Sequence, residues 1–184
     1  MGRLLFLLCT ILVLVGFAPQ SSYSPKAGET VMLVNVSGRG EIAIKLHTDK
    51  APKTTAQIIR LAESKFYDGQ KFFRVVKSPR PFLIQMGDPN SKTKPLDDPS
   101  MGTGGSGTKV AYEDTGYSNV EGAVGLSTPT DQRDAGDSQF YILLANQRFL
   151  DGQYTVFGQV VKGMDVVKTV ELGDQVTSVT IKRG

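Results

Sequence analysis

The chain has 184 residues, which fits one domain with a single sizeable core. Its net charge of +3 comes from scattered Lys and Arg residues, and no run of about five or six like charges is present. A nucleic-acid-binding stripe is therefore excluded, and we expect no nucleic-acid partner.

The N-terminus differs in kind from the rest of the chain. Arg3 precedes an apolar run from Leu4 to Ala18, and a polar stretch follows. This layout is typical of a secretory signal peptide. As a helix the run would be about 22 Å long, short of a hydrocarbon core of about 30 Å, so an uncleaved membrane anchor is the weaker interpretation. We predict a signal peptide or anchor over residues 1–24, a linker over 25–29 and one domain over 30–184, in a protein exported to the periplasm or the cell exterior.

Few residues of the predicted domain could bind a metal or act as a nucleophile. The only cysteine, Cys9, lies inside the apolar run, so the domain has no disulfide and no thiol. Asp97 and Asp98 lack the ligand spacing of a calcium loop. The lone histidine, His47, is expected to be a solvated loop residue, and it has no plausible nucleophile beside it. We expect no metal and no cofactor.

The first elements of the domain have clear periodicity. Residues 31–36 and 41–46 form a hairpin signal. Ile42, Ile44 and Leu46 alternate there with residues expected to face water, which are Glu41, Ala43 and Lys45. Asp49 and Pro52 are predicted to open a helix. Its apolar stripe recurs at helical spacing and consists of Thr55, Ile58, Ile59 and Ala62.

The remainder of the chain alternates between strands and loops. Apolar runs are separated by segments rich in Gly, Pro, Asp and Ser, with a short second helix near residues 161–168 and a last strand around Val179 and Ile181. Many short strands with two helices favour a closed antiparallel barrel, which leaves no sheet edge exposed. The strand runs are 72–76, 82–86, 123–126, 139–144 and 154–161, and the longest irregular stretch is 88–119.

Two segments are apolar and aromatic and contain few polar groups. The polar groups placed inside their apolar and aromatic stretches are Arg74, Gln85 and Gln139. This composition suits a pocket that holds an uncharged group with few hydrogen bonds, and it suits a phosphate site or a hydrolytic triad badly. The first segment is Phe72-Phe73-Arg74-Val75-Val76 with Phe82-Leu83-Ile84-Gln85-Met86-Gly87-Asp88, and the second is Gly136-Asp137-Ser138-Gln139-Phe140-Tyr141-Ile142 with Phe149-Leu150-Asp151-Gly152 and Val156-Phe157-Gly158.

The two segments resemble the signature segments of the cyclophilins, the peptidyl-prolyl cis–trans isomerases. The similarity covers roughly Thr30 to Lys182. It implies a mainly β fold, a closed eight-stranded antiparallel barrel capped by two α-helices. It also implies an enzyme that accelerates Xaa-Pro isomerisation in proline-containing polypeptides, without a cofactor, a metal or a covalent intermediate.

Isomerising an Xaa-Pro bond makes a specific chemical demand. The barrier of roughly 20 kcal/mol is amide resonance, which is lost as the bond twists. The twisted proline nitrogen becomes pyramidal and accepts a hydrogen bond, so a donor there stabilises the transition state more than the ground state. Arginine suits this task because it stays charged and holds its donors in a fixed fork. By this logic Arg74 is the donor.

The resemblance assigns roles to further positions. It implies that Arg74, Phe82 and Gln85 are catalytic, with Gln85 bonding the substrate backbone, and that the glycine run 102–107 is a loop near the substrate groove. Ser127 and Thr128 fall where the family binds the residue before proline. The implied substrate-binding residues are Leu83, Ser127, Thr128, Gln139, Tyr141, Phe149, Leu150 and Tyr154.

The sequence departs from the family pattern at three places. Seven residues, Val75 to Pro81, separate Arg74 from Phe82, more than in many cyclophilins, and should bulge at the rim. Phe149 and Tyr154 replace a common tryptophan and histidine, so the indole N–H is missing and cyclosporin binding should be weakened. Leu126-Ser127-Thr128 departs from the usual residues, which should shift the preference for the residue before proline.

A second interpretation remains open beside the isomerase. The same fold could serve as a binding module or chaperone that grips proline-containing segments with weak or no catalysis. We expect a monomer, because no apolar stripe is left over, and membrane contact only if residues 4–18 stay uncleaved.

Overall fold

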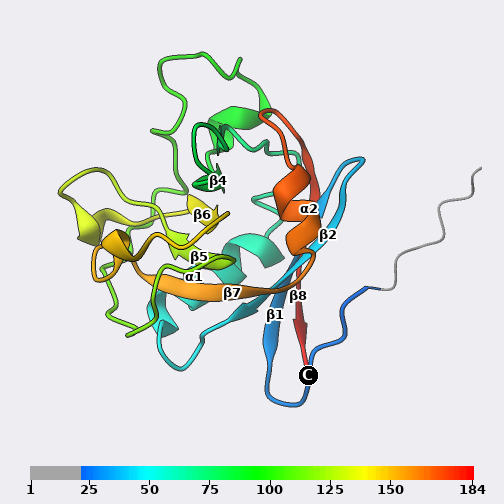
Figure 1. The fold of residues 1–184 in the computed structure, drawn as a ribbon, viewed down its shortest axis with the longest axis vertical. Coiled ribbons are helices and arrows are strands. Elements are labelled where there is room, and N and C mark those ends of the chain that lie inside the picture. The colour runs from blue at the N-terminus through cyan, green and yellow to red at the C-terminus, as the bar shows by residue number, and fades with distance from the viewer. Residues whose placement is uncertain (1–21) are drawn as a thin grey trace, which may run out of the picture.

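The computed structural model describes residues 22–184, so residues 1–21 of the predicted signal peptide lie outside it. Its strands form one eight-stranded sheet in the order β3-β4-β6-β5-β7-β2-β1-β8 (Figure 1), and every paired neighbour is antiparallel. The strands are β1 (Thr30–Val36), β2 (Gly40–Leu46), β3 (Arg74–Val76), β4 (Leu83–Met86), β5 (Ala123–Leu126), β6 (Phe140–Leu143), β7 (Val156–Lys162) and β8 (Val176–Arg183). The helices are α1 (Pro52–Glu63) and α2 (Met164–Thr169).

The two ends of the sheet, β3 and β8, meet through the residues just before them. Lys71 forms an isolated bridge with Gln175, and the Phe72 N–H donates to the Asp174 carbonyl at 3.0 Å. No ladder joins β3 to β8 in the part of the chain that the structure describes. The predicted eight antiparallel strands and two helices are thus confirmed. The strands form a curled sheet, and a barrel closed by a continuous ladder is not confirmed.

The core lies inside the curl. Ile42, Ile44 and Leu46 are buried there, as the alternation predicted. Helix α1 packs against β8 and α2 against β2. The buried face of α1 includes Ile58 and Leu61, and Ile59 of the predicted stripe is only partly buried.

Glu113 supplies the N-terminal cap of α1 from the loop between β4 and β5. Pro52 is the first helical residue, as predicted, but Ala51 precedes it and no side-chain cap comes from that position. The Glu113 carboxylate accepts from the backbone N–H groups of Lys53 (2.9 Å) and Thr54 (2.8 Å) and from the Thr54 hydroxyl (2.8 Å). These bonds satisfy donors that a helix start otherwise leaves free.

Residues 22–29 comprise the end of the predicted signal peptide and the predicted linker, and they contact the sheet through Tyr23. Tyr23 packs on Val31, Leu33 and Ala43, and its N–H donates to Glu41 at 2.9 Å. Ala43 was expected on a wet face and is instead fully buried. The segment before β1 therefore forms part of the folded structure.

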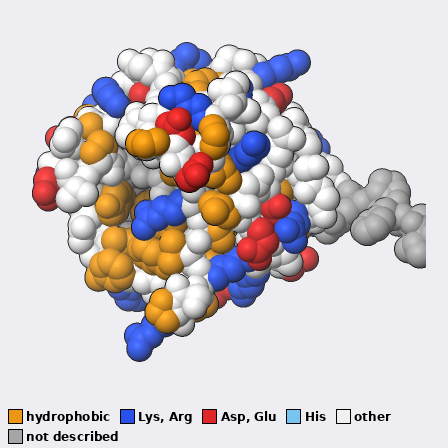
Figure 2. All heavy atoms as spheres, turned by 90° about the horizontal axis from the view of Figure 1, so that it is seen from above, with side chains coloured by type: hydrophobic (Ala, Val, Ile, Leu, Met, Phe, Trp, Pro, Cys, Tyr) orange, Lys and Arg blue, Asp and Glu red, His pale blue; other side chains and the backbone are white. Residues whose placement is uncertain are grey.

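The surface carries interspersed charges. On the face seen in Figure 2, hydrophobic side chains gather in one area with basic and acidic side chains around them, and no basic stripe crosses that face. No helix within residues 22–184 has the length and apolar character to cross a membrane.

Candidate active site

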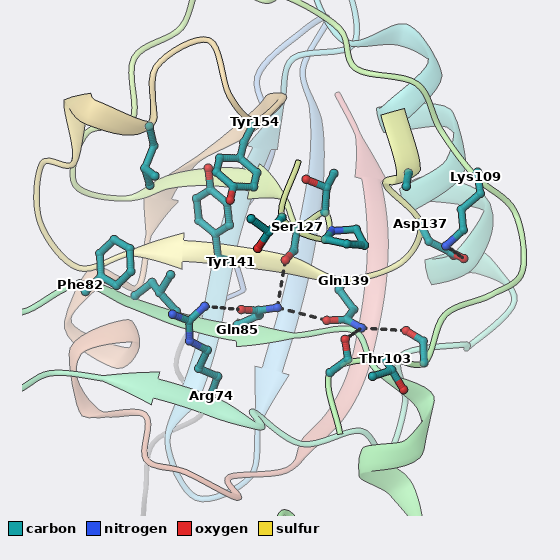
Figure 3. A pocket seen from close by; sticks show the side chains of 18 residues that line it. Arg74, Phe82, Gln85, Thr103, Lys109, Ser127, Asp137, Gln139, Tyr141 and Tyr154 are labelled. Carbon is teal, nitrogen blue, oxygen red and sulfur yellow. Dashed lines mark hydrogen bonds and ion pairs between the residues drawn. The ribbon is translucent and has the colours of Figure 1, made fainter. Parts of the chain in front are cut away.

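Arg74 and Phe82 meet in space across the segment 75–81. Arg74 begins β3, its strand partner is Gln85 on β4, and Phe82 stands just before β4. The guanidinium carbon lies 5.9 Å from the centre of the Phe82 ring, and Arg74 Nη1 donates to Gln85 Oε1 at 3.3 Å (Figure 3). The extra residues between Arg74 and Phe82 therefore do not separate the cation from the aromatic ring.

An apolar hollow opens beside this pair. It is part of a cavity of about 570 Å³. Leu83, Tyr141 and Leu150 are buried in its wall, and Tyr141 packs edge-to-face on Tyr154 at 5.7 Å. Predicted residues that line the cavity are Arg74, Phe82, Leu83, Gln85, Ser127, Thr128, Gln139, Tyr141, Leu150 and Tyr154.

Phe149 is the predicted residue that the structure does not place in this lining. Its side chain is 65% exposed, and its ring stacks on Phe82 with the ring centres 6.2 Å apart. Phe149 is the middle residue of the 3-10 turn Arg148–Leu150, and Leu150 is the residue of this turn that is buried. Phe149 therefore extends the outer side of the Phe82 ring and does not form the wall of the hollow.

Amide groups form the polar wall of the cavity. Gln85 Nε2 donates to Ser127 Oγ at 3.0 Å and to Gln139 Oε1 at 3.1 Å. Gln139 Nε2 donates to the carbonyls of Gly102 (2.9 Å) and Gly104 (2.7 Å). The glycine loop predicted near the groove thus contacts the site directly.

Sequence reasoning missed the residues that hold Tyr141. Its hydroxyl donates to Asn119 Oδ1 at 2.6 Å, and Asp151 accepts from the Asn119 N–H at 2.6 Å. Burial raises the pKa of Tyr141, and the backbone hydrogen bond from Asn119 lowers the pKa of Asp151. Asn119 lies in the irregular stretch 88–119, where no periodicity marks it.

Gly125 makes room for the Tyr141 ring. The two residues face each other in the β5–β6 ladder. A Cβ atom on Gly125 would overlap the ring and hydroxyl of Tyr141. Any larger residue here would force Tyr141 or the β5 backbone to shift.

His47 lies outside the cavity lining. It is partly buried and stacks on Tyr117 with the ring centres 4.0 Å apart, and burial lowers its pKa. It was expected to be a solvated loop residue. Residues 22–184 contain no cluster of His, Cys, Asp and Glu that could hold a metal ion.

The curled antiparallel sheet, together with an arginine over an aromatic hollow, defines a cyclophilin-like protein. The sequence model of the family described as cyclophilin type peptidyl-prolyl cis-trans isomerase/CLD matches residues 31–183. The chain belongs to this family, and it is a peptidyl-prolyl cis–trans isomerase.

Curated relatives carry the same enzyme name. The chain is 36% identical over 146 residues to a probable peptidyl-prolyl cis-trans isomerase of Brucella suis, covering 78% of this chain and 72% of the relative. It is 38% identical over 138 residues to isomerase ppi1 of Schizosaccharomyces pombe (72% and 80% covered). It is 34% identical over 142 residues to isomerase B of Bacillus subtilis (77% and 91% covered).

Solved structures share the fold. A cyclophilin type isomerase of Cryptosporidium parvum superposes with a TM-score of 0.72 at 19% identity, covering 85% of this chain and 99% of that one. A second structure of that protein, in the presence of the dipeptide Ala-Pro, gives a TM-score of 0.70 at 19% identity and covers 84% and 99%. At this identity the likeness supports the fold alone.

Proposed function

We propose that Arg74 is the donor that stabilises the twisted Xaa-Pro bond while the proline ring occupies the hollow. The observation that supports this is the approach of the guanidinium to the Phe82 ring, 5.9 Å from its centre, at the mouth of a cavity walled by Leu83, Tyr141 and Leu150. The apolar wall favours the twisted amide because it is less charge-separated than the planar one. The guanidinium supplies the hydrogen bond that only the pyramidal nitrogen accepts strongly.

The energies fit a site of this kind. To shorten the time constant of Xaa-Pro isomerisation from tens of seconds to milliseconds, the rate must rise about 10⁴-fold, which lowers the barrier by about 5.5 kcal/mol. One charged hydrogen bond contributes about 1.5–3 kcal/mol. Desolvation and positioning in the hollow supply the remainder.

The contacts of Gln85 support a role in orienting Arg74, and not the contact with the substrate backbone that the resemblance had implied. Both hydrogens of its amide are already donated, to Ser127 and Gln139, and its oxygen accepts from Arg74. A substrate carbonyl would have to displace one of these bonds. We therefore assign Gln85 to orienting Arg74, and leave Ser127 and Thr128 as the contacts of the residue before proline.

The catalytic rate should not depend on pH in the neutral range. Arginine stays protonated, and the raised pKa of Tyr141 keeps its hydroxyl neutral. We expect kcat/KM on an Ala-Pro peptide to be constant within about twofold between about pH 6 and 9. A bell-shaped profile would point to general acid–base catalysis and would contradict the donor mechanism.

Cyclosporin binding should be weak because Phe149 has no indole N–H. Phe149→Trp is expected to tighten the binding by about 2- to 10-fold, the effect of one hydrogen bond. Calorimetric titration of the wild-type and variant proteins measures this, with equal isomerase activity as the control. Equal affinities would show that position 149 does not limit cyclosporin binding.

We further propose that the enzyme is exported as a monomer and acts on proteins folding outside the cytoplasm. The support is the pattern of Arg3 followed by the apolar run 4–18. Because Ser22 and Tyr23 both contact Glu41, we place the cleavage site before Ser22, earlier than the boundary at residue 24 expected from the sequence. N-terminal sequencing and sizing of protein from the periplasm or medium test this, and a full-length cytoplasmic product would contradict export.

A further inference from the structure

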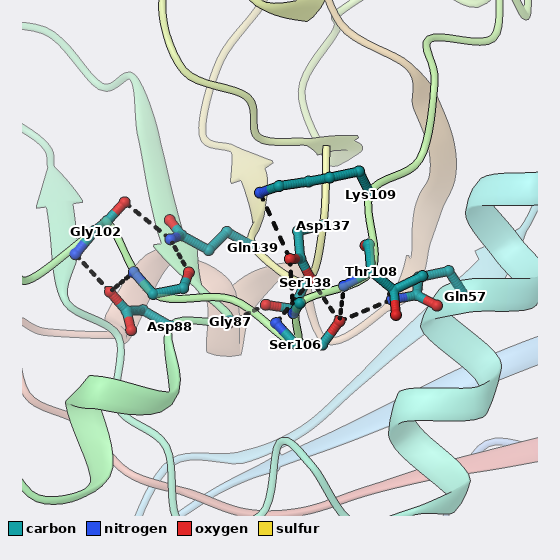
Figure 4. Close-up of polar contacts among 12 residues, drawn as sticks. Gln57, Gly87, Asp88, Gly102, Ser106, Thr108, Lys109, Asp137, Ser138 and Gln139 are labelled. Atoms are coloured by element: carbon teal, nitrogen blue, oxygen red, sulfur yellow. Dashed lines mark hydrogen bonds and ion pairs between the residues drawn. The ribbon is translucent and has the colours of Figure 1, made fainter. Parts of the chain in front are cut away.

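Asp88 holds the first half of the glycine loop. It is fully buried, two residues after the end of β4. Its Oδ2 accepts from the N–H groups of Gly102 (2.6 Å) and Gly104 (3.1 Å), and its Oδ1 accepts from the Asn90 N–H (2.8 Å) (Figure 4). A carboxylate is needed here because it offers two acceptor oxygens and no donor.

The carbonyls of the same two glycines bind Gln139. Both hydrogens of its amide go to Gly102 and Gly104, so the nitrogen must face the loop. The oxygen of Gln139 must then face the opposite way, toward Gln85. Asp88 and Gln139 therefore contact the two sides of one short piece of backbone.

The orientation of one amide sets that of the next. Because Gln139 presents its oxygen, Gln85 presents its nitrogen, and the Gln85 oxygen is left to accept from Arg74 Nη1 at 3.3 Å. An amide has nearly the same shape in both orientations but opposite polarity. If Gln139 reversed, it would present hydrogens to Gln85, and Gln85 would turn its hydrogens toward the guanidinium.

We propose that Asp88 is a positioning residue for the isomerase reaction. By fixing Gly102 and Gly104 it sets the orientation of both glutamine amides and so holds the Arg74 guanidinium over the hollow. This inference rests on the proposed function of Arg74. Asp88 acts through the loop and the glutamines and does not itself line the cavity.

The backbone of the loop is fitted to this carboxylate. Gly102 has φ of +86°, a left-handed conformation that favours glycine. A Cβ on Gly104 would overlap the Asp88 carboxylate and the Asn90 amide. Asp88→Asn would replace one acceptor oxygen by a donor, which must then face a backbone N–H.

The test compares Asp88→Asn with Glu113→Gln. Glu113 also accepts three hydrogen bonds and supports the fold, but it lies outside the cavity lining. Both variants are expected to lose stability. Asp88→Asn alone should lower kcat by about tenfold at little change in KM, because a small misplacement of a catalytic group is costly. It alone should also shift the NMR signals of the Gln85 side-chain amide.

A double-mutant cycle that combines Asp88→Asn with Gln139→Ala tests whether Asp88 acts through Gln139. If Asp88 acts through Gln139, the two losses in kcat will not add. Additive losses, or an Asp88→Asn protein with wild-type kcat and unmoved Gln85 signals, would overturn the proposal. Should Asp88→Asn fail to fold, Gly104→Ala perturbs the same contact from the loop and carries the same expectations.

The Arg74→Ala variant distinguishes a failure of this inference from a failure of the proposed function on which it rests. If Arg74→Ala keeps wild-type activity, the proposed function of Arg74 fails. If Arg74→Ala loses activity while Asp88→Asn keeps it, only the positioning role of Asp88 fails.

Discussion

Arg74→Ala is expected to lower kcat/KM on an Ala-Pro test peptide by about 10- to 150-fold. The range is the rate equivalent of one charged hydrogen bond of about 1.5–3 kcal/mol made only in the transition state. Arg74 is exposed and begins a short strand, so the fold should survive the change. A coupled-protease assay at low temperature measures the rate, and the melting temperature measures the fold.

Arg74→Lys is the matched control for charge. Lysine keeps the positive charge but lacks the planar fork that reaches Gln85 and the proline nitrogen together. We therefore expect most of the loss to persist in the lysine variant. Wild-type turnover in folded Arg74→Ala would remove this residue from its proposed role.

Phe140→Ala should lower the free energy of unfolding by about 3–5 kcal/mol. Phe140 is fully buried on β6 and packs edge-to-face against Tyr67 at 5.6 Å and Phe157 at 6.0 Å. Truncation leaves a cavity that these rings cannot close without moving. Urea unfolding of the two proteins gives the difference.

Phe149→Ala is the control, because it makes the same substitution at an exposed position. Its side chain is 65% exposed, so the free energy of unfolding should change by no more than about 0.5 kcal/mol. Equal losses at the two positions would contradict the burial on which the fold description depends. Because Phe140 alternates along β6 with Tyr141 of the hollow wall, its loss should also reduce activity, whereas Phe140→Leu should retain much of it.

The parts of the fold with strict periodicity could be predicted from the sequence. Ile42, Ile44 and Leu46 repeat every second residue and are buried, and the strand runs correspond to β3 to β7. The meeting of Arg74 with Phe82 could also be expected, although it depended on a resemblance and not on spacing. The regular β3–β4 ladder explains it, because it pairs Arg74 with Gln85 and leaves the extra residues in the loop between the two strands.

Contacts made by irregular segments could not be predicted. Ala43 belongs to an alternation that predicts exposure, but it is buried in a cluster with Val31 and Leu33, against which Tyr23 packs. Glu113 and Asn119 lie in the long loop and act on α1 and Tyr141, which are distant in sequence. No local pattern encodes such pairs.

The position of Phe149 shows the limit of reasoning by resemblance. The aromatic character at this position is preserved, but the ring lies on the outer side of Phe82. The turn that carries it places the next residue, Leu150, which was also predicted to bind substrate, in the wall of the hollow. An aromatic residue at the matching position therefore did not fix the direction of the side chain.

The most direct test of the central claim is exchange spectroscopy on an Ala-Pro peptide with catalytic amounts of the wild-type protein. If the hollow and Arg74 catalyse rotation, the cis and trans signals of the peptide will show exchange cross-peaks at mixing times of about a second or less, against tens of seconds without protein. Shifts that report peptide binding without any exchange between the two signals would contradict the account and leave a site that only grips proline.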